Sequence, residues 1–209
     1  MKRIIIFALT AAMAISAAQA QFTDKLVPHF GYMYTMVTMD GTNLEEGASA
    51  NYSFNTLGLG TYYTIKHHND WASFGIDPSI NLGLNLSNGS GQINWFTQGS
   101  LFFMGRLGAN STKYNTQKIG IGAGIGGVAS YLDQKALNGA IDMESFFLNP
   151  AAVGEITLNM RGSTLTGRVQ LSLSPAVKEG DLVTQDGNFL LQNREAKFGT
   201  IGLGLIYGF

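Results

Sequence analysis

Hydrophobic and polar residues alternate with a period of two along most of this chain. The clearest example runs from Ala72 to Leu86, where every even position is apolar and the odd positions hold only polar residues and glycine. Because successive side chains of a β-strand point to opposite faces, this stretch predicts one long strand with an apolar face and a polar face. At about 3.3 Å per residue it spans about 50 Å, which is enough to cross a bilayer at a tilt of about 40°.

The same alternation recurs along the rest of the chain and gives eight predicted strands. They comprise residues 28–39, 50–67, 71–87, 91–107, 117–132, 147–162, 164–177 and 196–209. Two of them have a weak polar face, because Met33 and Val37 interrupt the first and Phe96, Phe102 and Met104 interrupt the fourth. Lipid cannot satisfy the backbone groups of an open sheet edge, so membrane-crossing strands must close on themselves. The pattern therefore predicts an all-β fold, an eight-stranded antiparallel up-and-down transmembrane β-barrel.

The connecting segments predict an orientation with both chain ends in the periplasm. Long connectors then lie outside the cell and short ones inside, as is usual for such barrels. The predicted outer loops are Asp40–Ser49, Asp133–Ser145 and Lys178–Glu195, and the predicted short turns are His68–Asp70 and Gly162–Ser163. Two connectors deviate, since Asn88–Ser90 is a short outer loop and Gly108–Asn115 a long periplasmic turn. The outer loops could bind an extracellular ligand, but they carry no motif that identifies one.

The first twenty residues have the features of a secretory signal peptide. A basic start, Met1-Lys2-Arg3, precedes an apolar run from Ile4 to Ile15, and Ala18-Gln19-Ala20 matches a small-residue cleavage site. The alternative, an uncleaved membrane anchor, needs an apolar run of about 20 residues. We therefore expect a signal peptide over residues 1–20 and an outer-membrane barrel domain over residues 21–209.

Composition excludes several classes of protein. An apolar content of 45% with a net charge of −1 excludes a disordered chain, and the absence of a basic cluster excludes nucleic-acid binding. The chain has no cysteine, so disulfides, thiolate metal sites and lipid-modified cysteine are excluded.

Two motifs could suggest a metal or a cofactor. Adjacent His67 and His68 point to opposite faces of a strand, so they cannot easily bind one metal ion together. The glycines of residues 122–127 match a dinucleotide-binding pattern, but they lie within continued strand alternation and not between a strand and a helix. We therefore expect neither a metal site nor a cofactor.

Charged residues also occur on the faces that are predicted to line the lumen. They are Lys66, Asp77, Arg106, Lys118, Glu155, Arg161 and Arg168. A charge in so narrow a lumen must be paired, because an unpaired charge in a low dielectric costs several kcal/mol. We therefore predict a salt-bridge network that joins Asp77 and Glu155 to some of the three arginines. Such a network either plugs the barrel or acts as a gate whose re-pairing opens a narrow ion path.

The last strand brings a resemblance to a known family. A terminal Phe209 preceded by alternating apolar residues resembles the C-terminal insertion signal of Gram-negative outer-membrane barrels; the alternating residues are Ile201, Leu203, Leu205 and Tyr207. The predicted mature chain is similar to the small barrels of the OmpA transmembrane domain, OmpX and opacity type. The resemblance implies a location in the cell outer membrane among lipid and lipopolysaccharide. It also implies periplasmic chaperones and the barrel-assembly machinery as partners during biogenesis.

These features predict an integral outer-membrane protein with a polar, mostly plugged lumen and a structural or surface-interaction role. The alternative is a narrow porin for ions or small solutes. A barrel enzyme that modifies lipid A is disfavoured, since lipid A deacylases of this architecture use a His-x-Ser pair and the sequence contains none. We therefore expect no catalytic activity.

Overall fold

The computed structural model describes residues 25–41, 49–68, 71–86, 93–112, 115–135, 142–160, 163–183 and 189–208. These residues form nine strands: β1 (Leu26–Gly41), β2 (Ser49–His67), β3 (Ala72–Leu86), β4 (Ile93–Gly108), β5 (Ile119–Lys135), β6 (Asp142–Asn159), β7 (Thr164–Ser172), β8 (Ala176–Val183) and β9 (Phe189–Gly208). None of the described residues belongs to a helix that is long and apolar enough to cross a membrane. The expected signal peptide and Phe209 lie outside the described residues.

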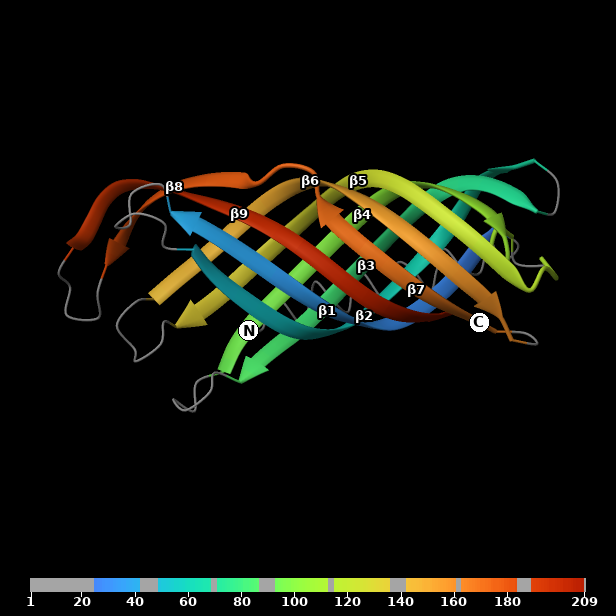
Figure 1. Ribbon diagram of the computed structural model, residues 1–209, viewed down its shortest axis with the longest axis horizontal. Helices are drawn as coiled ribbons and strands as arrows, with labels where there is room; N and C mark the ends of the chain where they lie inside the picture. Colours follow the sequence, from blue (N-terminus) through green and yellow to red (C-terminus); the bar gives the residue numbers. More distant parts are fainter. Residues whose placement is uncertain are drawn as a thin grey trace.

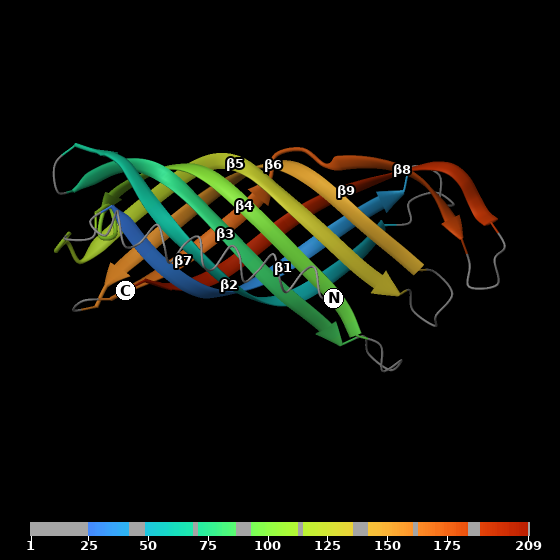
Figure 2. The same ribbon diagram turned by 180° about the vertical axis from the view of Figure 1, so that it is seen from behind.

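The sheet closes into an eight-stranded antiparallel barrel, so the predicted fold class is confirmed. Each strand from β1 to β6 pairs with the next, β7 pairs with β9, and β9 pairs with β1 to close the ring. β7 and β8 share one place in the ring, because β7 pairs with residues 201–208 of β9 and β8 with its earlier residues. Figures 1 and 2 show the steeply tilted strands of this cylinder from opposite sides.

The two ends of the barrel differ. At the turn end, on the right in Figure 1, β1 begins and β9 ends. Short connections join β2 to β3 and β6 to β7 there, whereas β4 and β5 are joined by the longer segment of residues 109–118. At the opposite end, called the loop end here, the β8–β9 hairpin extends beyond the other strands (Figure 1). The prediction of a loop over Lys178–Glu195 is therefore wrong, because most of that segment is strand. Beyond the bilayer a strand needs no apolar face, so the alternation that reveals membrane-crossing strands is lost there.

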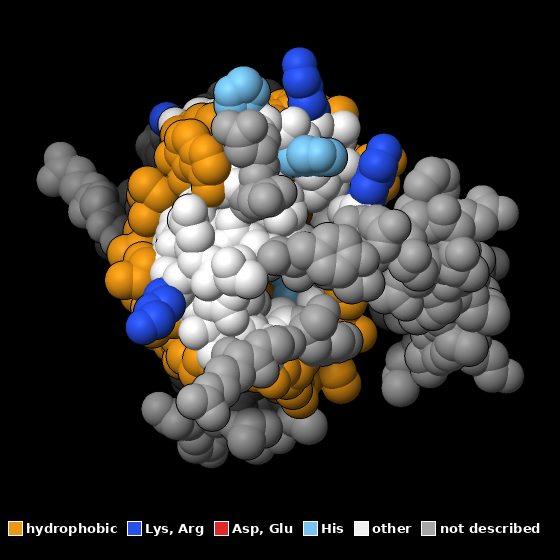
Figure 3. All heavy atoms as spheres, turned by 90° about the vertical axis from the view of Figure 1, so that its right-hand side faces the viewer, with side chains coloured by type: hydrophobic (Ala, Val, Ile, Leu, Met, Phe, Trp, Pro, Cys, Tyr) orange, Lys and Arg blue, Asp and Glu red, His pale blue; other side chains and the backbone are white. Residues whose placement is uncertain are grey.

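The outer surface of the barrel is apolar. Large apolar side chains on alternate positions are exposed, with exposed fractions of 70% for Leu57, 65% for Ile125 and 63% for Ile156. A soluble domain buries such side chains, so their exposure in a closed ring indicates a surface that faces lipid. Seen from the turn end, apolar side chains lie along the left and lower edges of a face of polar groups and backbone, and Lys and His side chains stand at its top (Figure 3).

The lumen is filled with side chains and is less polar than the alternation predicts. At the loop end lies an aromatic cluster, which comprises the buried residues Val37, Phe54, Phe96, Leu132, Phe147 and Phe198. A second apolar cluster, toward the turn end, comprises Val27, Tyr62, Phe102, Met104, Val128, Ala151 and Val153. Phe96, Phe102, Met104 and Val37, which weaken the predicted polar faces, are therefore lumen residues. An eight-stranded barrel is just narrow enough for side chains to fill it.

Candidate functional site

The candidate site is a cluster of four buried charged residues in the lumen. Asp77 lies on β3, Arg106 on β4, Glu155 on β6 and Arg168 on β7, and each is at most 4% exposed. Glu155 and Arg168 are direct cross-strand partners, whereas Arg106 and Glu155 both lie opposite Gly122 of the intervening β5. These four residues occupy lumen-facing positions on four different strands, and the closure of the barrel brings their side chains together.

Each guanidinium bridges both carboxylates. Arg106 donates from Nε to Glu155 Oε2 at 2.9 Å and from Nη2 to Asp77 Oδ2 at 2.8 Å. Arg168 donates from Nε to Glu155 Oε1 at 2.8 Å and from Nη2 to Asp77 Oδ2 at 2.6 Å. Two acids and two bases give the cluster a formal charge of zero. Such mutual pairing offsets the desolvation of four buried charges, because every charge has two partners of opposite sign.

Gly122 provides the space for this arrangement. A Cβ atom at Gly122 would lie 3.0 Å from Glu155 Oε2 and 3.2 Å from the Cγ of Arg106. The absence of a side chain on β5 thus lets Arg106 reach Glu155 across an intervening strand. The alternation alone gives no sign that this glycine has a role in the charge cluster.

Two further residues complete the cluster and are absent from the sequence prediction. The guanidinium carbon of Arg106 lies 3.9 Å from the ring centroid of Tyr62, in cation–π geometry, and the Tyr62 hydroxyl is 3.0 Å from Ser73 Oγ. His29 Nε2 lies 3.6 Å from Asp77 Oδ1, and the imidazole is buried. The phase of β1 could have revealed His29, because it alternates with the outward-facing Phe30.

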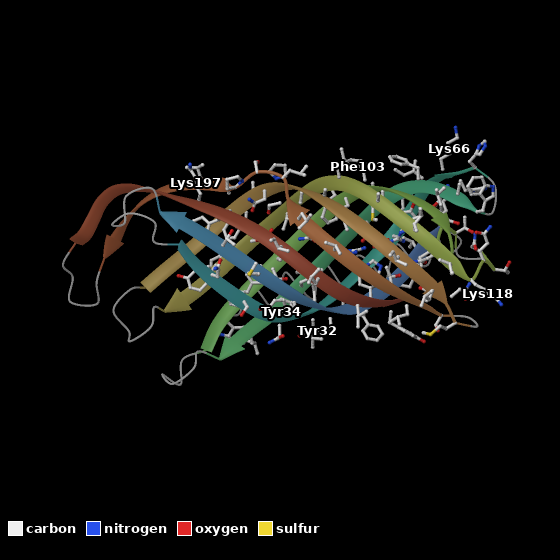
Figure 4. All side chains as sticks on the ribbon, in the orientation of Figure 1. Tyr32, Tyr34, Lys66, Phe103, Lys118 and Lys197 are labelled. Carbon is white, nitrogen blue, oxygen red and sulfur yellow. The ribbon has the colours of Figure 1, made fainter. Side chains whose placement is uncertain are left out.

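The other predicted lumen charges are not in this cluster. Lys66 is exposed and faces outward, because it pairs with outward-facing Phe74 after a register shift between Thr64 and Lys66. A β-bulge of this kind reverses the phase of the alternation, so the lumen prediction for Lys66 is wrong. Lys118 is also wrongly predicted, since it is exposed in the turn before β5. Figure 4 shows both lysines at the turn end. Arg161 lies outside the described residues.

The cluster holds fixed charges, and some of its polar atoms have no hydrogen-bond partner among the described residues. Several buried polar atoms at or near it have no hydrogen-bond partner among the described residues: His29 Nε2, Asp77 Oδ1, Asn81 Nδ2, Arg106 Nη1 and Gln170 Oε1. No group of three or more His, Asp or Glu side chains suited to a metal ion occurs in the described part of the chain. The arrangement therefore places a closely paired charge cluster inside the lumen.

Comparison with solved structures shows the same architecture. Ail, the attachment invasion locus protein of Yersinia pestis, solved with the heparin analogue sucrose octasulfate, is 14% identical; the match covers 89% of this chain and 99% of Ail at a TM-score of 0.50. The outer membrane protein OprG from Pseudomonas aeruginosa is 10% identical; the match covers 89% of this chain and 97% of OprG at a TM-score of 0.53. The fold is that of the small outer-membrane β-barrels.

This likeness establishes the fold, and the apolar exterior is what suits this fold to the outer membrane. No protein-family model matches the sequence, and no curated protein matches it. The apolar residues of the predicted insertion signal lie on the outer face of β9, where Ile201, Leu203 and Leu205 are 38%, 53% and 58% exposed. Tyr207 is half-buried beside Phe30, with ring centroids 5.5 Å apart. Recognition of this strand by the assembly machinery stays a prediction.

Proposed function

We propose that this protein is a plugged outer-membrane barrel that has a structural or surface-interaction role and conducts no ions along its axis. The observation that carries the proposal is the filled lumen. An ion on the axis would meet the aromatic cluster at the loop end and then the four paired charges. Each guanidinium is held by two carboxylates, and the apolar rings offer no replacement for the water around an ion.

Single-channel recording in planar bilayers tests the plug. We expect no steady current from the unmodified barrel, because neither layer leaves a hydrated path. Steady openings of the unmodified protein would contradict the proposal. Lys66→Ala is the matched control for charge removal, since Lys66 is exposed and outside the lumen.

A narrow ion path is the second candidate function. The buried polar atoms without partners, among them Arg106 Nη1 and Asp77 Oδ1, could bind water or a passing ion once the salt bridges re-pair. Recordings of Arg168→Ala and Glu155→Ala separate this candidate from a permanent plug. Openings in these variants would support a gate, whereas silence in every variant would exclude it.

The surface role requires the loop end to lie outside the cell. The chain has no cysteine, so a single introduced thiol reports its own accessibility. A membrane-impermeant maleimide should label Lys197→Cys on β9 in intact cells, because this charged side chain lies at the loop end (Figure 4). Lys66→Cys, at the turn end, should be labelled only after lysis. The reverse pattern would place the turn end outside and remove the basis for a surface role.

The proposal includes lipid partners and no catalysis. The apolar exterior supports contact with outer-membrane lipid and lipopolysaccharide, and the last strand supports recognition by periplasmic chaperones and the barrel-assembly machinery. Asp77 and Glu155, the acidic residues of the charge cluster, are ion-paired to arginines, which leaves neither as a free general base. Mass spectra of lipid A from cells with and without the protein should therefore be identical. A change in acylation would refute this part of the proposal.

A further inference from the structure

The hairpin of β2 and β3 carries a lysine on the lipid-facing surface at the turn end. Without the register shift after Thr64, Lys66 would lie opposite Ser73, which is buried. The extra residue, Ile65, instead pairs Lys66 with Phe74, which is 48% exposed on the outer face. A β-bulge can redirect a side chain in this way. One extra residue thus moves Lys66 from the lumen side of the wall to the lipid side.

Two exposed aromatic rings lie on the same hairpin as Lys66. Phe74 is its cross-strand partner, and Trp71, in the turn, is 46% exposed. The Gly108 N–H donates to Trp71 O at 2.6 Å, which links this turn to the end of β4. A tryptophan ring with its polar N–H is best placed at the headgroup level of a bilayer, where it contacts both hydrocarbon and water. The hairpin therefore presents a cation and two rings at the edge of the apolar surface.

The described charged and histidine side chains at the turn end include no carboxylate. They are Lys25, Lys66, His67, His68 and Lys118, and each is exposed. No described acidic side chain is visible on this face of the molecule (Figure 3). None of the ion pairs among the described residues involves Lys66. The Lys66 ammonium group can therefore bind an external anion.

We propose that Lys66, Trp71 and Phe74 form a site for one anionic phospholipid. The Lys66 ammonium group binds the headgroup phosphate, because its long apolar stem lets the charge reach the headgroup layer. The two rings contact the glycerol region and the first carbons of the acyl chains. Phosphatidylcholine carries a cation beside its phosphate, so the site prefers a lipid such as phosphatidylglycerol. The site does not depend on the proposed surface role, since it requires only that the turn end meets a headgroup layer.

The two tryptophans of the chain make this site measurable by fluorescence. Trp95→Phe leaves Trp71 as a reporter at the site. Trp71→Phe leaves Trp95, which is 52% exposed near the loop-end start of β4, as the reference. Each variant is reconstituted in phosphatidylcholine vesicles that contain a minor fraction of brominated phosphatidylglycerol or, in parallel, the same fraction of brominated phosphatidylcholine. Bromine quenches a nearby tryptophan, so the two quenching curves give the relative binding of the two lipids.

We expect Trp71 to report a preference of about fivefold for phosphatidylglycerol, the effect of one lysine near an anionic headgroup. Trp95 should be quenched equally by both lipids. Equal quenching of Trp71, or the same preference at Trp95, would overturn the proposal. In the Trp95→Phe background, Lys66→Gln should remove most of the preference and Lys66→Arg should keep it. A preference that survives Lys66→Gln would also overturn the site.

Lys118→Gln is the matched control, because Lys118 is an exposed lysine of the turn end that lies well apart from Lys66 in Figure 4. It should leave the preference at Trp71 unchanged. Equal losses in Lys66→Gln and Lys118→Gln would assign the effect to the general charge of this end and refute a local site. Inorganic phosphate at constant ionic strength should not compete, and competition would refute a lipid as the ligand.

Heat-modifiable migration confirms that each variant is folded before the lipids are compared. Vesicles of phosphatidylcholine alone contain no anionic headgroup that Lys66→Gln could lose. The stability of the barrel in them should therefore be the same with and without Lys66. Adding phosphatidylglycerol should stabilise the unmodified barrel more than Lys66→Gln, because the lipid binds the folded state. Equal stabilisation of the two would contradict a site at Lys66.

Discussion

Removal of one member of the charge cluster should destabilise the barrel far more than removal of a matched pair. Glu155→Gln leaves two arginines with one carboxylate, and Arg168→Gln leaves two carboxylates with one arginine. Each single variant therefore buries one uncompensated charge, for which we expect a loss of about 3–5 kcal/mol in the free energy of unfolding. The double variant keeps the pair of Arg106 and Asp77, which are 2.8 Å apart and remain charge-neutral.

The double variant should thus be less destabilised than the sum of the two single variants. Arg168 and Glu155 share two hydrogen bonds, of 2.8 Å and 2.5 Å, and both side chains are almost fully buried. Residues in direct contact couple by about 0.5–3 kcal/mol, and the buried setting places this pair at about 2 kcal/mol or more. The interaction free energy is the quantity to measure.

Urea unfolding in lipid vesicles, followed by the fluorescence of the two tryptophans, measures these free energies. Lys66→Gln is the control, because the side chain is exposed and a surface change of this kind stays within about 0.5 kcal/mol. Additive effects of Glu155→Gln and Arg168→Gln would refute the coupled network. Single variants as stable as the control would show that the lumen is hydrated enough to solvate an unpaired charge.

Three further predictions follow from the same structure. Gly122→Ala should cost about 1–3 kcal/mol in urea unfolding, because its Cβ crowds Glu155 and Arg106, whereas Gly154→Ala meets no atom within 4 Å and should be neutral. Phe209→Ala should lower the yield of folded barrel seen as heat-modifiable migration, with Lys66→Ala as the unaffected control. Amino-terminal sequencing of the exported protein should begin at Gln21, and a start at Met1 would contradict the predicted signal peptide.

The period-two alternation was sufficient to predict the closed barrel and the inward direction of Asp77, Arg106, Glu155 and Arg168, which the structure brings together. It failed for Lys66 because a single bulge inverts the phase of a strand without leaving a mark in the sequence. The alternation also could not predict which arginine pairs with which carboxylate. This pairing depends on the cross-strand register, as in the contact of Arg106 and Glu155 across Gly122.

The alternation also fails at the loop end of β6, and this failure has a physical reason. Phe146, Phe147 and Leu148 are consecutive apolar residues, of which Phe146 and Leu148 are 51% and 63% exposed while Phe147 is 1% exposed. A strand that separates lipid from a polar lumen must alternate, since one face contacts hydrocarbon and the other contacts polar groups. A strand that is apolar on both faces lies between two apolar environments. At this segment the wall separates hydrocarbon from the aromatic cluster, so side-chain packing, and no change of polarity, determines which residues face inward.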